Sequence, residues 1–452
     1  MALDPKVFKA YDVRGIYPSE LDEEGARAIG RAYVEQFEPK AIAVGRDMRL
    51  SSPCMHAAFV QGASEAGADV LDVGMIGTEM LYQAVGELGL DGGATVTASH
   101  NPKDYTGMKI VRRGALPVGA DSGLLEIRDR ALSIAAGARG QTPDVAGKVE
   151  RRDTYGDFVR KVMSFVDTEA VGRLRVVIDA ANGMAGPMLA PILERLPVDA
   201  VRCSFEPDGS FPSHEPNPLL PENREFIVAK VTEERADLGI AFDGDADRCF
   251  FVDDTGEFVP GDFVTALLAE AMLEKEPGGT VIYDVRASWA VRDTVEKLGG
   301  KPVMSRVGHA YIKLLMREVD AVFAGEVSGH YYFRDFYQAD SGTIPALLLL
   351  ELVSKRGQKL SEILRPLRGR YFITGEINTP VADVALTVQE LKEHFAGQGE
   401  ISHLDGISVT ADDWHLNVRP SNTEPLLRLN LEALDRNLME RKRDEALAVI
   451  RG

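Results

Sequence analysis

The stretch LGIAFDGDADR, residues 238–248, joins a short apolar run to three aspartates at alternate positions. A continuous apolar run of this length is typical of a strand that is buried on both faces. Ligands of open α/β sheets bind beyond the carboxyl ends of strands, so the polar loop after the run is a candidate site. The stretches GATVTASHNP at 93–102 and AVFAGEVSGH at 321–330 likewise consist of an apolar run followed by a polar loop. The chain therefore predicts three buried strands that end in polar loops.

The elements that lead to these loops repeat in one order, β-α-β-α-β. The predicted strands and helices of the three blocks are 41–47, 52–66, 68–74, 78–89 and 93–102; 175–183, 185–196, 198–203, 222–236 and 238–248; and 280–286, 288–298, 301–308, 309–319 and 321–330. Alternating strands and helices predict α/β sheets. Such repetition can reflect ordinary α/β construction, but here the corresponding loops also carry related chemistry. We therefore expect three similar α/β domains whose loops could point at one cleft.

The pattern changes after about residue 366. The runs ISVTADDWHLNV and PLLRLNLEA alternate apolar and polar residues around a turn, and a helical tail follows them. This predicts a fourth domain with a different fold. A length of 452 residues agrees with several domains, because a single hydrophobic core stops growing well below it.

The composition excludes several classes of partner. The formal net charge is −19, and nucleic acids and anionic membranes are bound through basic surfaces, so we expect neither as a partner. The opening MALDPKVFKAYD lacks a signal-peptide pattern, and the longest apolar stretch, 344–350, ends at a glutamate. Cys54, Cys203 and Cys249 are isolated and form no CxxC pair. We expect buried thiols in a protein of the cytoplasm.

The three aspartates of LGIAFDGDADR would repel one another strongly unless a cation lay among them. Ligand sets made only of oxygen favour Mg²⁺ or Ca²⁺. A calcium EF-hand loop begins with the same spacing, but it needs Gly where Arg248 stands and Glu where Asp254 stands. A solvated acidic turn is the bland alternative, and it explains one aspartate better than three. The spacing favours a Mg²⁺ site at Asp243, Asp245 and Asp247, which a phosphate oxygen could complete.

A hydroxyl and an imidazole are neighbours in the loop Thr97-Ala98-Ser99-His100-Asn101-Pro102. Taken alone, this sequence is more typical of a capped turn than of a nucleophile. A serine becomes reactive only beside a base or a metal, and neighbours in sequence need not touch. Ser99 is therefore a candidate nucleophile only in combination with the other loops.

Two further loops suit a phosphorylated sugar. Gly325-Glu326-Val327-Ser328-Gly329-His330 offers a carboxylate for sugar hydroxyls, and its glycines let the backbone approach a ligand. Arg419-Pro420-Ser421-Asn422-Thr423-Glu424 has the donors of a phosphate clamp. Taken alone, the first loop is explained better by a Gly-bounded turn with exposed polar residues, and the second at least equally well by a plain hairpin turn. Basic residues near the repeated loops could supply the positive charge that a phosphate needs: Arg14, Lys109, Arg286 and His309.

In their order and spacing, the four loops resemble those of the α-D-phosphohexomutase superfamily, in particular its bacterial phosphomannomutase/phosphoglucomutase branch. The resemblance covers essentially the whole chain. It implies three similar mixed α/β domains and a C-terminal TATA-binding-protein-like α+β domain around a central cleft. The predicted domains are 1–145 with the phosphoserine, 146–253 with the metal, 254–366 for sugar recognition and 367–452 for phosphate binding.

The resemblance also assigns residues to roles. It implies a catalytic set of Ser99, Arg14, His100, Lys109, Arg248 and His330. The implied substrate-binding residues are Tyr11, Arg286, His309, Glu326, Ser328, Arg419, Ser421, Asn422 and Thr423. The implied Mg²⁺ ligands are Ser99, Asp243, Asp245 and Asp247.

The implied reaction interconverts hexose 1-phosphate and hexose 6-phosphate through phospho-Ser99 and a hexose 1,6-bisphosphate, which also serves as activator. The substrate is a phosphate of mannose, glucose or both, and the enzyme is a monomer or a small homo-oligomer. A phosphoglucosamine mutase is an alternative, although such enzymes typically carry Gln where Val327 stands. A Mg²⁺-dependent sugar phosphatase and a non-catalytic sugar-phosphate receptor are further alternatives from other classes.

Overall fold

A computed structural model of the chain describes residues 3–138, 145–420 and 426–452. The chain divides into two compact units, 1–258 with 330–357 and 259–329 with 358–452. The segment 330–357 thus belongs to the first unit, although the sequence prediction groups it with the third domain. The four predicted domain boundaries stay a prediction.

The first sheet of the first unit has the order β1-β5-β4-β2-β3-β7, and β6 pairs with β5. Its strands are β1 (Val13–Ile16), β2 (Ala41–Arg46), β3 (Asp69–Met75), β4 (Gly92–Val96), β5 (Tyr105–Arg112), β6 (Leu116–Pro117) and β7 (Val149–Arg151). Strands β4, β2, β3 and β7 run parallel, whereas β5 returns antiparallel to β4. The serine loop is therefore the connection between β4 and β5.

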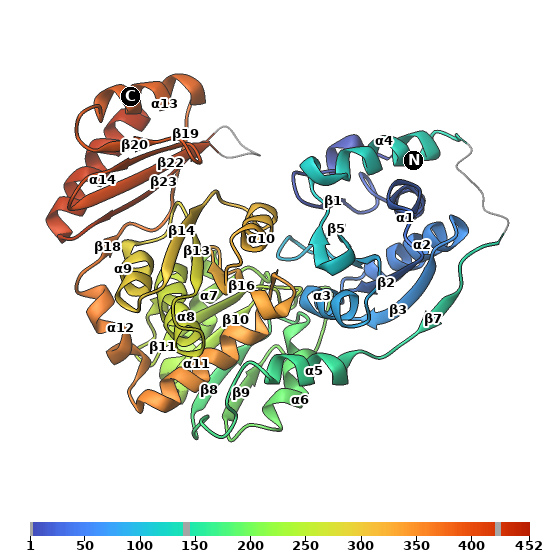
Figure 1. Cartoon of the computed structure of the whole chain (residues 1–452), viewed down its shortest axis with the longest axis horizontal. Helices are drawn as coiled ribbons and strands as arrows, with labels where there is room; N and C mark the ends of the chain where they lie inside the picture. Colours follow the sequence, from blue (N-terminus) through green and yellow to red (C-terminus); the bar gives the residue numbers. More distant parts are fainter. Residues whose placement is uncertain (1–2, 139–144, 421–425) are drawn as a thin grey trace. The chain divides into compact units, whose positions relative to one another are not determined.

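The helices around this sheet are α1 (Glu23–Phe37), α2 (Ser52–Glu65), α3 (Thr78–Glu87) and α4 (Leu124–Ala135). Helices α1, α2 and α4 pack together in Figure 1. Their apolar side chains meet the sheet in one core that contains Ile29, Phe59, Val44 and Ile110. Helix α3 contacts β2 and β4 separately from that group, and it begins next to the polar loops.

The second sheet has the order β12-β11-β10-β8-β9. Its strands are β8 (Arg175–Asp179), β9 (Asp199–Cys203), β10 (Leu238–Phe242), β11 (Cys249–Asp253) and β12 (Phe258–Val259), and its helices are α5 (Tyr155–Met163), α6 (Ala185–Leu193) and α7 (Pro221–Glu234). Strand β11 returns antiparallel to β10, so the aspartate loop connects them as the serine loop connects β4 and β5. The first unit also contains β16 (Tyr331–Phe333), β17 (Ala339–Asp340) and α11 (Thr343–Arg356).

In the second unit, β13 (Thr280–Asp284) runs parallel to both β14 (Lys301–Ser305) and β15 (Phe323–Gly325). The helices of this part are α8 (Gly261–Lys275), α9 (Trp289–Lys297), α10 (His309–Glu318) and α12 (Leu360–Arg368). The predicted β-α-β-α-β order is confirmed here as in the other two blocks. The antiparallel return strands, which make the sheets mixed, have no counterpart in the predicted repeat.

The C-terminal part of the second unit is an antiparallel sheet with the order β18-β23-β22-β21-β20, and β19 pairs with β23. Its elements are β18 (Phe372–Ile373), β19 (Ile377–Pro380), α13 (Val384–His394), β20 (Glu400–Ser402), β21 (Ile407–Thr410), β22 (Trp414–Pro420), β23 (Leu426–Ala433) and α14 (Arg436–Arg451). Side chains of α13 and α14 share one core with Leu416 and Val418 of β22. The change of fold predicted after residue 366 is confirmed.

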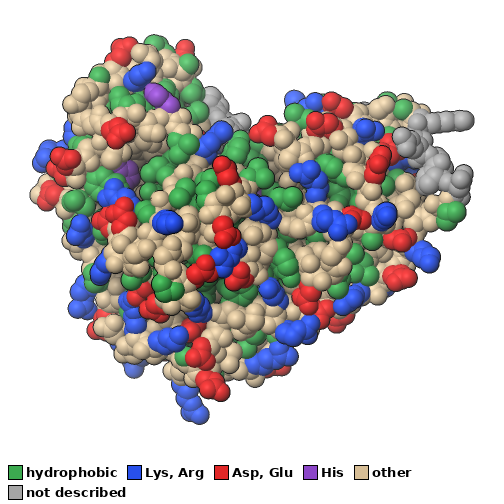
Figure 2. Space-filling model, viewed as in Figure 1, with side chains coloured by type: hydrophobic (Ala, Val, Ile, Leu, Met, Phe, Trp, Pro, Cys, Tyr) green, Lys and Arg blue, Asp and Glu red, His purple; other side chains and the backbone are tan. Residues whose placement is uncertain are grey.

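The surface charges, the polarity of the helices and the burial of the cysteines can be compared with the predictions made from composition. Acidic and basic side chains are interspersed over the face drawn in Figure 2. Within the described residues, every helix is too short or too polar to cross a lipid bilayer. Cys203 and Cys249 are buried as expected, whereas Cys54 is only partly buried.

Candidate active site

Ser99 lies in a strained turn just beyond the end of β4. Its φ of +50° is in the left-handed region, which non-glycine residues rarely adopt. Thr97 Oγ1 accepts a 2.9 Å hydrogen bond from the Ser99 backbone N–H and so supports this turn. Strain of this kind persists where surrounding contacts fix it, and it is concentrated at functional sites.

A buried arginine fixes the rest of the serine loop. Arg49, which is fully buried, donates from Nη2 to the carbonyl oxygens of Ser99 (2.8 Å) and Asn101 (2.6 Å). Its Nη1 donates to the carbonyl of Pro102 at 2.7 Å. Asp47 in turn lies 3.3 Å from Arg49 Nε. The sequence prediction missed this pair, because a buried arginine that donates mainly to backbone oxygens leaves no motif of its own.

The Ser99 hydroxyl contacts the aspartate loop. Its Oγ donates to Asp243 Oδ2 at 2.9 Å and lies 3.2 Å from His100 Nδ1. Arg248 Nε donates to the same Asp243 oxygen at 2.8 Å. Burial lowers the pKa of His100 well below its usual value, and the positive charge of Arg248 lowers it further. The structure therefore brings the Ser99 hydroxyl to a carboxylate and a guanidinium that follow it by more than 140 residues in the sequence.

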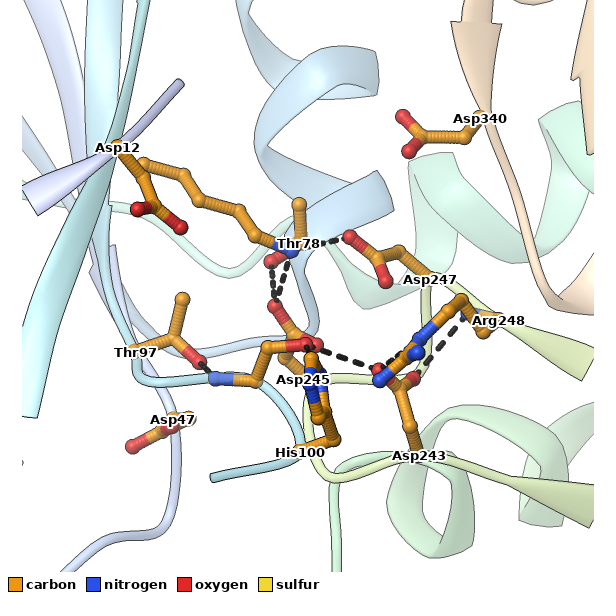
Figure 3. A network of polar contacts seen from close by, with 12 residues as sticks. Asp12, Asp47, Thr78, Thr97, His100, Asp243, Asp245, Asp247, Arg248 and Asp340 are labelled. Atoms are coloured by element: carbon orange, nitrogen blue, oxygen red, sulfur yellow. Dashed lines mark hydrogen bonds and ion pairs between the residues drawn. The ribbon is translucent and has the colours of Figure 1, made fainter. Parts of the chain in front are cut away.

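Asp243, Asp245 and Asp247 are buried, and one carboxylate oxygen of each lies within 4.8 Å of the others. Figure 3 shows the three side chains converging. The Lys109 ammonium, from β5, donates to Asp245 Oδ2 at 2.8 Å and also contacts Asp247 Oδ2. Lys109 and Arg248 thus neutralise part of the charge that was expected to need a cation, and the Mg²⁺ site stays a prediction.

The acidic cluster still fits a cation. Asp245 Oδ1 and Asp247 Oδ1 are buried and have no hydrogen-bond partner in the described part of the chain. Leaving a buried carboxylate oxygen unsatisfied is costly, and oxygen atoms are the ligands that Mg²⁺ prefers. These two oxygens, with Asp243, could hold such an ion.

The charges of the cluster act on one another. Burial raises the pKa of Asp247 to about 7, and the negative charge of Asp245 adds to the effect. Burial alone would also raise the pKa of Asp245, but Lys109 lowers it overall, with help from a hydrogen bond from Thr78. One carboxylate of the pair thus keeps its charge while its neighbour resists ionisation, as expected for close like charges.

His330 joins this cluster, although the prediction places it in the sugar-recognition loop. Its Nδ1 lies 3.0 Å from Asp340 Oδ2 and 3.9 Å from Asp247 Oδ1. Asp340 ends β17, and the sequence prediction gave it no role. A histidine beside one carboxylate is typical of a residue that moves protons, because the carboxylate fixes its tautomer.

A second charged cluster lies in the second unit. Asp284, at the end of β13, accepts two hydrogen bonds of 2.9 Å from the Arg286 guanidinium. Glu326 is buried, and its Oε1 accepts from the Gly308 backbone N–H at 3.0 Å. Arg286 Nη2 lies 3.9 Å from the same Glu326 oxygen. The structure thus groups the predicted sugar-contacting residues Arg286 and Glu326.

The predicted phosphate clamp extends this second cluster. Arg419 of β22 and Arg428 of β23 are opposite each other in the sheet and donate to the two oxygens of Glu376, at 3.2 Å and 3.1 Å. Arg286 Nη1 lies 3.6 Å from Glu376. Sequence reasoning missed Glu376 and Arg428, because they lie outside the Arg419 motif and meet it only through sheet pairing.

The remaining predicted site residues lie outside the contacts described so far. Arg14 Nη1 donates to Asn101 Oδ1 at 2.5 Å, and its Nη2 contacts Asp12, so Arg14 lies beside the serine loop. Partly exposed positions are occupied by Tyr11, His309 and Ser328. Ser421, Asn422 and Thr423 lie outside the described residues.

Four family models match consecutive parts of the chain. They describe the alpha/beta/alpha domains I, II and III and the C-terminal domain of phosphoglucomutase/phosphomannomutase, and they match residues 5–136, 153–256, 260–371 and 376–449. The chain belongs to the phosphoglucomutase/phosphomannomutase family. The resemblance drawn from the four loops is thereby confirmed.

Relatives support the assignment over nearly the whole length. A phosphomannomutase of Salmonella montevideo is 45% identical, with 98% of each chain covered. A phosphomannomutase of Escherichia coli K12 is 44% identical, again with 98% of each chain covered. A solved phosphoglucomutase/phosphomannomutase family protein of Burkholderia thailandensis has a TM-score of 0.90 at 33% identity, covering 99% of this chain and 97% of its own.

These findings confirm the predicted fold class and the prediction of a hexose phosphate mutase. They do not favour the phosphoglucosamine mutase, phosphatase and receptor alternatives. The family models do not assign individual residues, so the roles of the site residues rest on the geometry described above.

Proposed function

We propose that this family member transfers a phosphoryl group between O1 and O6 of mannose and glucose phosphates, with Ser99 as its carrier. The hydrogen bond from Ser99 Oγ to Asp243 Oδ2, 2.9 Å long and inside the buried acidic cluster, carries the proposal. It puts a hydroxyl in a strained turn against a base and beside Arg248, the combination that activates a nucleophile.

A phosphoryl group on Ser99 would change the balance of charge. It replaces the proton that Oγ donates to Asp243, so the phosphate oxygens and that carboxylate repel each other. We propose that Ser99, Asp243, Asp245 and Asp247 hold Mg²⁺. The buried Oδ1 atoms of Asp245 and Asp247, to which the described residues donate no hydrogen bond, support this. When bound, the ion supplies positive charge to the phosphoryl group during transfer.

In the first half-reaction, the bond between phosphorus and Ser99 Oγ breaks, and a bond forms between phosphorus and O6 of a hexose 1-phosphate. We assign the O6 proton to His330 Nε2, because Asp340 Oδ2, 3.0 Å from Nδ1, favours the tautomer that leaves the lone pair on Nε2. Lys109 and Arg248 stabilise the charge on the equatorial phosphoryl oxygens.

The second half-reaction reverses the first. The 1,6-bisphosphate turns end over end and gives its O1 phosphoryl group to Ser99. The hexose 6-phosphate then leaves, and added 1,6-bisphosphate activates enzyme that has lost its phosphate. Arg419 would bind the phosphate that is not reacting in each half.

Sugar recognition follows from the second cluster. We propose that Glu326 and Ser328 bind O3 and O4, at which mannose and glucose agree. Discrimination at C2 needs a group dedicated to that hydroxyl. We therefore expect both sugars to be used within about an order of magnitude in kcat/KM, whereas a preference above about a thousandfold would indicate an O2 contact, with Arg286 the first candidate.

The test mixes purified protein with glucose 1-phosphate or mannose 1-phosphate, a trace of 1,6-bisphosphate and Mg²⁺. A mutase yields the hexose 6-phosphate, a phosphatase yields inorganic phosphate and a receptor yields neither. EDTA should stop turnover, and added Mg²⁺ should restore it. Full activity of metal-free protein would contradict the proposed metal role but not the proposed phosphoryl transfer.

Two further expectations stay predictions: that the protein is located in the cytoplasm, and that it is a monomer or a small homo-oligomer.

A further inference from the structure

Helix α3 begins against the aspartate loop and holds one of its residues at two points. The backbone N–H of Thr78, the first residue of α3, donates to the Asp245 carbonyl oxygen at 3.0 Å. Its side-chain Oγ1 donates to Asp245 Oδ2 at 2.5 Å, a contact drawn in Figure 3. Both residues are fully buried. Thr78 therefore fixes the backbone and the carboxylate of the same aspartate.

The approach of α3 to the loop depends on the residue before Thr78. A Cβ atom at Gly77 would lie 2.9 Å from the Asp245 carbonyl oxygen and 2.3 Å from Met188 Sδ, so a larger residue would push the helix away. Glu79, which follows Thr78, accepts hydrogen bonds of 2.6 Å and 3.2 Å from the Oγ1 and the backbone N–H of Thr343, the first residue of α11. Helix α3 is thus also anchored to the start of α11.

The two oxygens of Asp245 have different surroundings. Oδ2 accepts from both Thr78 Oγ1 and Lys109 Nζ, at 2.5 Å and 2.8 Å. Oδ1 is buried, and the described residues offer it no hydrogen bond. Two donors on one oxygen fix the rotation of the carboxylate, so the other oxygen keeps a constant direction. This is how residues behind a metal ligand orient it.

We infer that Thr78 is a positioning residue that holds Asp245 Oδ1 ready for the divalent cation. The inference rests on the proposed metal role of the aspartates. The plain alternative is that the threonine hydroxyl only satisfies a buried carboxylate. That alternative predicts a loss of stability when the hydroxyl is removed, but no specific loss of metal affinity.

The test measures Mn²⁺ binding to the full-length protein. Mn²⁺ prefers oxygen ligands, as Mg²⁺ does, and electron paramagnetic resonance measures the concentration of free Mn²⁺. Thr78→Val removes the hydroxyl and keeps the branched shape, and Thr78→Ser keeps the hydroxyl. Thr106→Val is the matched control, because Thr106 is also fully buried and its Oγ1 lacks a hydrogen bond within the described chain. Asp245→Asn reports whether Mn²⁺ binds at the cluster.

We expect Thr78→Val to raise the Mn²⁺ dissociation constant about 10- to 100-fold, the usual effect of losing a residue behind a metal ligand. Thr78→Ser and Thr106→Val should stay within about threefold of wild type, and high Mg²⁺ should restore much of the kcat of Thr78→Val. Wild-type affinity in a folded Thr78→Val would overturn the inference. If Thr78→Val does not fold, Thr78→Ala replaces it, and failure of both to fold would likewise overturn the inference in favour of a structural role. A wild type that binds Mn²⁺ no better than Asp245→Asn would instead refute the metal role itself.

Discussion

The two units hold charge clusters of opposite sign. In the first unit, Asp243, Asp245 and Asp247 face Lys109 and Arg248, and two carboxylate oxygens have no hydrogen bond in the described residues. In the second unit, Arg419 and Arg428 share the single carboxylate of Glu376, whereas Arg286, 3.6 Å from Glu376, is already paired with Asp284. The first cluster has negative charge to spare for a cation, and the arginine pair of the second cluster has positive charge to spare for a phosphate. An enzyme that transfers phosphoryl groups between sugar oxygens needs both a cation site and a phosphate site.

The pKa values of two carboxyl groups, the buried Glu79 and the partly buried Glu376, differ in the same way. Burial raises the pKa of Glu79, in the first unit, to about 8, and the negative charge of Asp247 adds to the shift. Burial alone would also raise the pKa of Glu376, in the second unit, but Arg286, Arg419 and Arg428 lower it overall. Burial, with a smaller contribution from Asp247, thus favours the neutral form of Glu79, whereas the three arginines favour the charged form of Glu376.

The largest effect is expected for Ser99→Ala, which removes the carrier from the negative cluster. Turnover should fall by roughly 10³-fold or more, because no other described hydroxyl contacts Asp243 as Ser99 does. Intact-mass measurement of fresh wild-type protein should show a partly phosphorylated species that the variant lacks. Thr106→Val serves as the control for losing a buried hydroxyl. Activity near that of wild type would exclude Ser99 as the carrier.

Arg419→Ala tests the positive cluster. We expect kcat/KM for hexose 1-phosphate to fall about 10- to 1000-fold with a higher KM, because a charge-assisted contact to phosphate is worth roughly 1.5 to 4 kcal/mol. The exposed Arg441 of α14 gives the control variant Arg441→Ala, which should behave as wild type. If both variants have wild-type kinetics, another group binds the distal phosphate.

Much of this organisation could be predicted from the sequence, because strand-loop repeats and motifs are local. The loops with Ser99, Asp243 and Glu326 follow strands where the apolar pattern places them. The antiparallel return strands pair directly with the strands before them, but the predicted β-α-β-α-β repeat ends at the polar loops and leaves them out. Contacts between segments far apart in the sequence are out of reach: Arg49 donates to the backbone oxygens of the serine loop, and Glu376 accepts from Arg419. Residues that position others have no pattern of their own in the sequence.

Glu79→Gln tests whether burial beside the first cluster raises the pKa of Glu79. Because the folded pKa of about 8 exceeds the ordinary value of 4.5, folded protein binds the extra proton, and wild-type stability falls as the pH rises through this window. Gln keeps the shape and does not titrate. The thermal midpoint of the variant, measured relative to wild type by calorimetry, should rise by several degrees between pH 5.5 and pH 8.5. A constant difference would mean that Glu79 ionises normally.

The smallest effect, and the one whose sign matters most, is expected for Glu376→Gln. In wild type the carboxylate neutralises Arg419 and Arg428, so a phosphate that reaches Arg419 must compete with it. Removing its charge should lower the KM for hexose 1-phosphate about 3- to 10-fold, as for one partly exposed ion pair worth about 1 kcal/mol. The same change leaves the arginines without their anion, so the thermal midpoint should fall without substrate and rise more than that of wild type when substrate is added. Glu376→Asp, which keeps the charge on a shorter side chain, is the control for packing. If Glu376 instead orients Arg419 for phosphate, Glu376→Gln will raise the KM, and the positive charge of the second cluster will not be in surplus after all.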